Sequence, residues 1–357
     1  MALNASGAIS LAGTTTGQSI ELELGGDGTT QISFNDSNVR SLLGISSGAI
    51  SLFSAYGVSN LPSFAPMIGG TNNGGTTTYA TNDKYTFSSD TISAGTNYPT
   101  NLMYGIAAGN TSVVNFTNGA TTRRLYSYSG DSWSTGSNFS PSPASYGGMI
   151  SNKTVAINRN NGAVATTQKY TYTSDTVAVA TSLTYAAYAG GGCVGNSLQG
   201  LWCGGTSTSS LTIAYKTSGK YIYSNDTTAA GGNLTYSMVG GGGTYFMPGI
   251  GISTTGIFTG GNDAYTIYGT TQTCVYTYST DGTVAGTSLA YAVSYSMTGG
   301  STTSGITIGG WTNLQSVGAY AAGSSKYTYS SSAVTTGGSL SFARGGGAGP
   351  GATPAAI

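Results

Sequence analysis

The sequence predicts an all-β protein in which a six-bladed β-propeller follows a small, mostly-β N-terminal segment. Three observations predict it: a composition that suits strands, six copies of one aromatic motif, and two chain segments that together complete one repeat. A β-propeller is a ring of four-stranded sheets, called blades, arranged around a central channel.

Composition favours strands over helices along almost the whole chain. Glycine accounts for 58 of 357 residues, and only 6% of residues are charged, against about 25% in an ordinary soluble domain. Glutamate, a common residue of helix surfaces, occurs only at Glu21 and Glu23, whereas threonine, tyrosine and valine recur throughout. We therefore expect nearly all regular structure to be β.

The repeat is a short segment in which aromatic and polar residues alternate. Each copy has a tyrosine, an aromatic residue two positions later, an aspartate or serine five positions after the tyrosine, and a large apolar residue eight positions further on. The opening tyrosines, 41 to 55 residues apart, are Tyr85, Tyr126, Tyr170, Tyr221, Tyr276 and Tyr327. Alternation with period two predicts a strand with one buried face, and the step that follows it predicts a turn.

Glycine pairs mark a second strand in four of the six repeats. Four copies are preceded by such a pair at the end of an apolar run: Gly69–Gly70, Gly204–Gly205, Gly260–Gly261 and Gly309–Gly310. One repeat therefore accommodates about four short strands with tight turns, which is the size of a propeller blade.

The two ends of the repeat region complement each other. The last copy stops at Ile357, just before the position of the next glycine pair, and the first begins at residues 64–70, at that same point of the period. We expect residues 61–357 to form the propeller, with the C-terminal strand or strands completing the first blade beside Met67–Gly70. Closure of this kind removes open sheet edges.

The N-terminal segment, residues 1–60, is expected to be mostly β with one short helix. Ile20, Leu22 and Leu24 alternate with glutamates, which predicts a half-exposed strand. Asp36 or Ser37 has the side chain to cap a short helix that ends before residue 44.

A duplicated hexapeptide, Ser-Gly-Ala-Ile-Ser-Leu, occupies residues 6–11 and 47–52 and could form two paired strands. Sixty residues bury little core, so the segment is expected to gain order by packing on a partner or on copies of itself. A small, self-sufficient β cap is the alternative. Residues 57–62, with Pro62, are typical of a linker.

Both parts resemble phage proteins. The repeats, above all Leu340–Arg344, resemble Kelch-type repeats, especially those in structural proteins of marine and cyanobacterial phages. The first 60 residues are similar to the start of many tailed-phage virion proteins. The segments that carry this second resemblance are residues 6–11, 17–20, 31–36, 38–42 and 47–52.

The resemblance implies a virion structural protein, made in the host cytoplasm and assembled on the particle surface. It implies that residues 1–60 dock on other virion proteins while the propeller projects as a tail-fibre-like appendage that binds the host surface, with a host glycan as a candidate ligand. The expected docking residues are Ile20, Leu22, Leu24, Val39, Arg40, Leu42 and Leu43. Two alternatives remain: a capsid decoration or tail-scaffold protein without a receptor, and a free carbohydrate-binding lectin. The start of the chain lacks the features of a signal peptide, which argues against the lectin.

The sequence argues against an enzyme and predicts no catalytic residue, metal site or cofactor. Histidine, the commonest general base and metal ligand, is absent. Five aspartates occupy the same turn position of separate repeats, too dispersed for one catalytic pair: Asp90, Asp131, Asp175, Asp226 and Asp281. We expect each to bond its own backbone, with calcium binding as the alternative. No basic cluster exceeds Arg123–Arg124 and no apolar run is long enough for a membrane span, so neither nucleic acid nor membrane is expected.

The aromatic residues are expected to be mainly structural. One tyrosine of each pair is expected to pack between blades, with the other on the opposite face. Trp202 and Trp311 flank glycine pairs and are interpreted as core or channel residues, whereas Trp133 follows a turn and is the candidate surface contact for a receptor. The three cysteines, an odd number, are expected to be free thiols.

Overall fold

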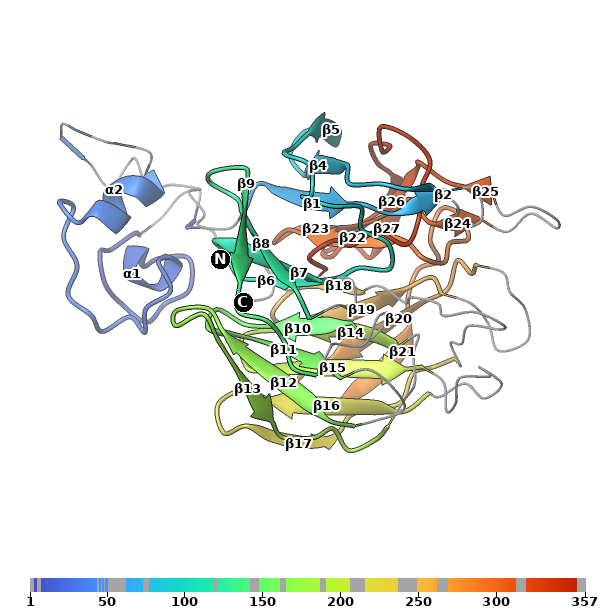
Figure 1. Ribbon diagram of the computed structural model, residues 1–357. Helices are drawn as coiled ribbons and strands as arrows, with labels where there is room; N and C mark the ends of the chain where they lie inside the picture. Colours follow the sequence, from blue (N-terminus) through green and yellow to red (C-terminus); the bar gives the residue numbers. More distant parts are fainter. Residues whose placement is uncertain are drawn as a thin grey trace. The chain divides into compact units, whose positions relative to one another are not determined.

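The computed structural model divides the chain into two compact units, Met1–Pro62 and Ser63–Ile357 (Figure 1). The residues that it describes are 3–4, 8–43, 45, 47, 49–50, 62–72, 77–117, 121–141, 148–160, 165–186, 191–205, 216–236, 249–261, 269–312 and 319–351.

The second unit is built from six antiparallel sheets, one for each repeat (Figure 1). Blade 1 is β1 (Phe64–Ile68), β4 (Asn82–Thr86) and β5 (Thr91–Ala94); blade 2 is β6 (Ile106–Gly109), β7 (Val113–Thr117), β8 (Arg123–Ser127) and β9 (Ser132–Gly136); blade 3 is β10 (Met149–Ser151), β11 (Val155–Arg159), β12 (Thr167–Thr171) and β13 (Thr176–Ala180). Blade 4 is β14 (Gly191–Gly195), β15 (Gln199–Gly204), β16 (Ser218–Ile222) and β17 (Thr227–Ala230); blade 5 is β18 (Gly249–Gly251), β19 (Thr255–Thr259), β20 (Thr273–Thr277) and β21 (Gly282–Ala285); blade 6 is β22 (Met297–Gly300), β23 (Ser304–Ile308), β26 (Ser324–Thr328) and β27 (Ala333–Thr336). Two small ribbons, β2 (Thr71–Asn72) with β3 (Thr77–Thr78) and β24 (Trp311–Thr312) with β25 (Ala319–Tyr320), extend blades 1 and 6.

The innermost strands of neighbouring blades lie side by side. β6 contacts β10, β10 contacts β14, β14 contacts β18, β18 contacts β22, and β22 contacts β1. Blades 1 and 2 meet in an apolar cluster that contains Ile68 and Val114. The sheets therefore surround one axis, and the predicted six-bladed propeller is confirmed.

The C-terminal segment lies against the inner edge of blade 1. Ile68 and Ala348 exchange backbone hydrogen bonds of 2.8 and 2.9 Å, and Thr71 and Gly345 exchange bonds of 2.7 and 3.1 Å. Blade 1 thus combines segments from the beginning and the end of the propeller: the C-terminal segment bonds Ile68 at the end of β1 and Thr71 at the start of β2.

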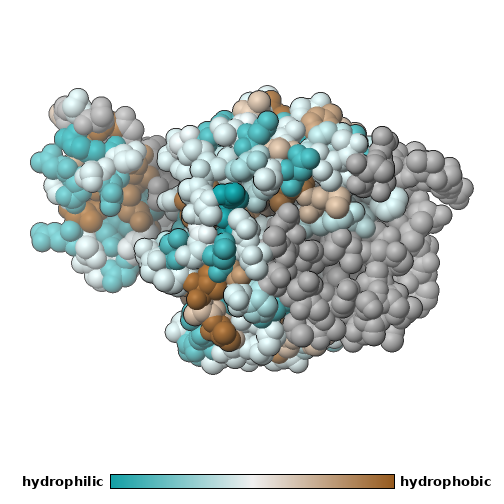
Figure 2. Space-filling view, viewed as in Figure 1, coloured by the Kyte–Doolittle hydropathy of each residue, from teal (hydrophilic) through white to brown (hydrophobic). Residues whose placement is uncertain are grey.

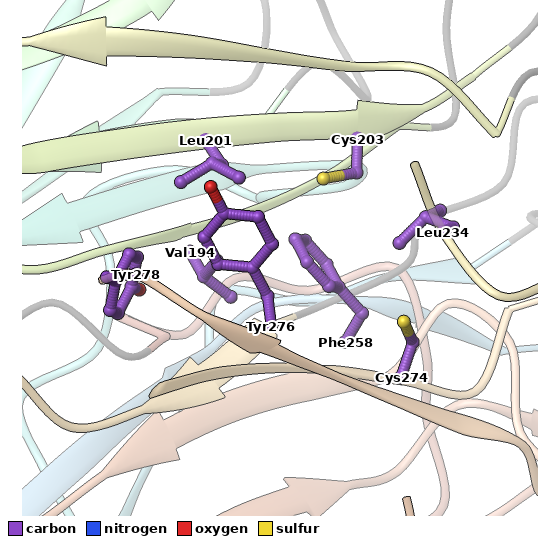
Figure 3. Packing of buried hydrophobic residues seen from close by; sticks show 8 residues of the cluster. All are labelled: Val194, Leu201, Cys203, Leu234, Phe258, Cys274, Tyr276 and Tyr278. Carbon is purple, nitrogen blue, oxygen red and sulfur yellow. The ribbon is translucent and has the colours of Figure 1, made fainter. Parts of the chain in front are cut away.

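The motif residues form the contacts between blades. The opening tyrosine of every copy is at most 2% exposed, and the apolar residue eight positions after the turn is at most 6% exposed. Between blades 4 and 5, Leu201 and Cys203 meet Phe258, Cys274 and Tyr276 (Figure 3). The cysteines are free, as expected.

One expectation about the aromatic pairs is wrong. The second aromatic residue does not lie on the opposite face, because positions i and i+2 of an extended chain point the same way. Ring centroids within the pairs lie 5.1 to 6.2 Å apart, for example 5.2 Å between Tyr85 and Phe87. The two rings of each pair therefore lie next to each other on the same face of the strand.

On the face shown in Figure 2, the described residues are mostly of intermediate hydropathy, with small separate patches at both extremes. This follows from a composition rich in Gly, Ser and Thr and only 6% charged.

The N-terminal unit contains two short helices, α1 (Ile20–Glu23) and α2 (Ser37–Leu43). The helix predicted after Asp36 or Ser37 is confirmed, but the strand predicted over residues 20–24 is wrong. The Ser19 side chain accepts a 3.2 Å hydrogen bond from the Leu22 amide and caps α1. Five alternating residues are too few to separate a strand from one helical turn, in which Ile20 and Leu24 share a face.

A small apolar cluster holds this unit together. Leu3, Ile20 and Val39 are at most 2% exposed, and seven partly buried apolar residues pack on them. The predicted pairing of the two hexapeptides falls partly on residues 6–7, 48 and 51–52, which lie outside the described residues.

Candidate functional site

The five turn aspartates share a strained backbone conformation. Their φ angles lie between 43° and 54°, in the left-handed region, and Ser332, the sixth residue of the set, has φ 53°. Such angles are uncommon outside glycine but are tolerated by aspartate. In blade 1 the Tyr85 hydroxyl donates a 2.5 Å hydrogen bond to the Asp90 carboxylate, and Tyr126 donates one of 2.7 Å to Asp131. The turn thereby aims each carboxylate at the blade interface.

Each of these carboxylates forms an ion pair with the preceding blade. The pairs are Lys84–Asp131, Arg123–Asp175, Lys169–Asp226, Lys220–Asp281 and, from blade 6 back to blade 1, Lys326–Asp90. The four lysine pairs have N···O distances of 2.6 to 2.9 Å. Together they join five of the six blade interfaces.

The expectation that the turn aspartates bond their own backbone is wrong. Asp131, Asp175 and Asp226 instead accept hydrogen bonds from backbone amides of the preceding blade, at Thr96, Ser137 and Thr181. Such a carboxylate accepts hydrogen bonds from a lysine or arginine, from a tyrosine hydroxyl and from a backbone amide of the neighbouring blade, as Asp131 does.

The sixth interface, between blades 5 and 6, has neither the lysine nor the aspartate of this ion pair. Val275 stands at the lysine position of blade 5, and Ser332 stands at the aspartate position of blade 6. Val275 packs beside Ile250, Ile257 and Tyr327 in an apolar cluster. The lysine position is also apolar in blade 2, at Leu125, and there Arg123 supplies the cation for Asp175 instead.

Acid should weaken the ring through these aspartates. Burial raises the pKa of Asp226, but hydrogen bonds from Tyr221 and Lys169 outweigh it and lower the pKa to about 2; the pKa values of the other four are also lowered. A carboxyl with a depressed folded-state pKa stabilises the fold above its unfolded pKa of 3.8, and that contribution is lost as pH falls toward 2. Because the pairs are partly exposed, we expect about 0.2–1 kcal/mol from each.

Urea unfolding between pH 6 and about pH 2 should therefore show a midpoint that is flat down to about pH 4 and then falls. Asp226→Asn should be less stable at neutral pH and should show a smaller fall. A midpoint that does not change across this range would contradict the assignment.

The central channel is nearly filled by the backbone. A cavity of about 50 Å³ lies on the axis, lined mainly by small residues of the innermost strands, among them Gly105, Gly148, Gly191 and Gly249. Ligand pockets usually measure roughly 300–1,000 Å³, so this cavity is too small for a sugar or peptide. The innermost strands pack closely around the axis, since a Cβ added at Gly249 would lie 2.2 Å from the Cys193 carbonyl oxygen.

A buried ion pair joins the C-terminal segment to blade 1. Arg344 is 0% exposed, and its Nη1 donates to Asp83 at 3.0 Å, while Nε and Nη2 donate to the carbonyl oxygens of Gly69 and Met67 at 2.8 and 3.2 Å. The amide and hydroxyl of Ser341 also donate to Asp83, both at 2.8 Å. All three donor nitrogens of Arg344 are occupied.

The tryptophans occupy different environments. Trp202 is fully buried, and its indole N–H donates to the Gly148 carbonyl at 3.3 Å, which confirms a core role. Trp311 is half-buried and stacks on Tyr320 at 6.4 Å. Trp133, the candidate receptor contact, is half-buried between blades 1 and 2, where its indole N–H donates to the Thr96 carbonyl at 2.8 Å.

The expected docking residues belong largely to the N-terminal unit's own core. Ile20 and Val39 are fully buried there, and the residues partly buried against them include Leu24, Leu42 and Leu43. Leu22 is half-buried, and the half-buried Arg40 donates from Nη2 to the Asn35 side chain at 3.1 Å.

The described part of the chain lacks two further features. Within it, no group of three or more cysteine, aspartate or glutamate side chains is placed to hold a metal ion. None of its helices is long and apolar enough to cross a membrane.

Comparison with known proteins yields a likeness of fold. No protein-family model matches the chain, and no curated protein matches its sequence. Among solved structures it is similar to a protein named YjhT, with a TM-score of 0.56 and 13% identity over 78% of this chain and 99% of the other. It also aligns with a fungal alcohol oxidase of the AA5 family in complex with copper, with a TM-score of 0.48 and 12% identity over 79% of this chain and 66% of the other. At such identities the likeness extends to the propeller fold alone.

Proposed function

We propose that this protein is a non-catalytic structural component of a phage particle, which docks through residues 1–60 and displays its propeller for binding to the host surface. The observation that carries the non-catalytic part is the use of the propeller carboxylates. Asp83 and the five turn aspartates are each held in an ion pair that joins two segments of the ring. Carboxylates held this way serve assembly of the ring, whereas general acid–base chemistry needs groups that are free to exchange protons with a substrate.

The separation of the chain into two units supports a division of labour. The unit Met1–Pro62 has its own apolar cluster, and the propeller is closed by contacts within Ser63–Ile357. The resemblance of the first unit to the start of tailed-phage virion proteins assigns attachment to that unit. Because Ile20 and Val39 support its interior, docking on other virion proteins falls to its outer residues, such as Leu22 and Arg40.

A decoration or scaffold protein without a receptor is the second candidate. It is favoured by the outer strands β13 and β21, where Val179 is 80% exposed and Val284 is 61% exposed. Uncharged outer strands suit lateral packing against neighbouring subunits.

A shortened chain tests the proposal. A protein that begins at Leu61 should retain its β-sheet circular dichroism and cooperative melting, because the contacts that close the ring lie beyond that residue, yet it should be missing from purified particles. Quantitative mass spectrometry of particles made with either chain gives the copy number. Residues 1–60 fused to an unrelated soluble domain should compete for the same position. Incorporation of the shortened protein at full copy number would place the docking surface on the blades instead.

A further inference from the structure

Three arginines of the propeller are buried, and two of them have a carboxylate partner. Arg344 pairs with Asp83, and Arg123 pairs with Asp175 while its guanidinium lies 3.3 Å from the ring centroid of Tyr170. The third, Arg159, lies at the end of β11 and is only 1% exposed.

Arg159 has no charge partner within the described propeller. Its Nε and Nη2 are buried and have no hydrogen-bond partner there. The six aspartates in the described part of the propeller, Asp83 and the turn aspartates, are already paired with other cations. Burial lowers the pKa of Arg159, but a guanidinium remains charged at neutral pH. An uncompensated buried charge is strongly unfavourable, so the site is suited to an anion from outside the chain.

The titratable neighbours do not supply that anion. Tyr185 and Cys193 are the groups that act electrostatically on Arg159. Burial raises the pKa of the Cys193 thiol to about 12, and burial likewise raises the pKa of Tyr185. Both groups are therefore neutral near pH 7, and the thiol is directed to the Met149 carbonyl at 3.1 Å.

The vacant donors define the shape of the anion. In a guanidinium, Nε–H and Nη2–H lie on one edge and point in parallel, which matches the two oxygens of a carboxylate. Arg344 directs the same edge to the carbonyl oxygens of Gly69 and Met67. In Arg159 this edge is vacant.

We propose that Arg159 is the anchor of a carboxylate-binding site where blades 3 and 4 meet, and that its ligand is an acidic saccharide of the uronic-acid type. The saccharide part rests on the proposed host-surface binding. The carboxylate part rests on the vacant guanidinium edge and on the neutral neighbours Tyr185 and Cys193.

The test uses the full-length protein and D-glucuronate, with D-glucose as the matched neutral sugar and acetate as the bare carboxylate. D-glucuronate should raise the melting temperature in a concentration-dependent manner, because a ligand that binds the folded state stabilises it. D-glucose should give no shift, and acetate a smaller one at equal concentration. Direct titration calorimetry should give the same order of affinity.

Two variants separate the site from general charge effects. Arg159→Met should abolish the D-glucuronate shift and, without ligand, should melt no lower than the parent, because it removes an unpaired buried charge. Arg124→Met, which removes the charge of a half-buried arginine on β8, should leave the shift intact. Arg159→Lys retains charge but loses the parallel donors, so it should weaken the shift even if Arg159→Met fails to fold.

An absent shift in the parent, or an equal shift in Arg159→Met, would overturn the site. An equal response to acetate and D-glucuronate would overturn the saccharide assignment. Incorporation of Arg159→Met into particles separates the binding site from the proposed attachment through residues 1–60. The variant should join particles at full copy number, because Arg159 lies in the propeller. The attachment role is thus tested independently of ligand binding at Arg159.

Discussion

Replacing Arg344 with alanine is expected to reduce the free energy of unfolding by about 3–5 kcal/mol, the usual effect of removing one partner of a buried ion pair. The change leaves the Asp83 carboxylate, 2% exposed, without its cation. It also leaves the carbonyl oxygens of Gly69 and Met67 without their side-chain donors. Because these groups join the C-terminal segment to blade 1, the loss falls on the contact that closes the ring.

The matched control is Lys84→Ala, which removes the cation of an ion pair of similar length, 2.7 Å, whose side chains are 20% and 31% exposed. Exposed pairs contribute about 0.2–1 kcal/mol, so this variant should lose far less stability in urea unfolding. Pairing Arg344→Met with Asp83→Leu should recover part of the loss, since no unpaired charge remains. Equal effects of Arg344→Ala and Lys84→Ala would contradict the closing role of the buried pair.

The propeller could be predicted because the same aromatic motif occurs six times in the sequence. A single copy of Tyr85-Thr86-Phe87 indicates only a strand, but six copies at intervals of 41 to 55 residues indicate six similar units. The residues named by the motif are those that fill the blade interfaces, such as Tyr126 in blade 2 and Leu234 in blade 4.

The ion pairs between blades were not predicted, because each links residues of different repeats. Lys84 and Asp131 are 47 positions apart, and no local pattern associates them. The exceptions among the copies gave no clear signal. The position before the tyrosine is apolar at Val275 in copy 5, where copy 6 has Ser332 in place of aspartate. It is also apolar at Leu125 in copy 2, yet copy 3 keeps Asp175, whose cation comes from Arg123.

The N-terminal unit and Arg159 show where such reasoning fails. Residues 20–23 form a helix because Ser19 caps the turn and Ile20 packs in the unit's apolar cluster. A five-residue alternation does not contain this information. Arg159 occurs in one repeat only, so no repeated pattern identifies it. Its vacant donor edge became evident only from the positions of all the other charges.

Deleting Ser341–Ile357 should have the largest effect of any change considered. The deletion removes Arg344 together with the segment that bonds Ile68 at the end of β1 and Thr71 at the start of β2. It also removes Ala348 from an apolar cluster that contains Ile68, Leu102 and Val114. Blade 1 would then expose unpaired backbone groups at Ile68 and Thr71, and an open sheet edge is a template for association.

We therefore expect the shortened protein to aggregate or to lose cooperative unfolding, as measured by size-exclusion chromatography and thermal melting. Removal of residues 352–357 alone is the control: it retains Arg344, Gly345 and Ala348, and the protein should remain monodisperse. A protein ending at Leu340 that stays soluble and melts close to the parent would show that blades 1 and 6 close the ring without the C-terminal segment.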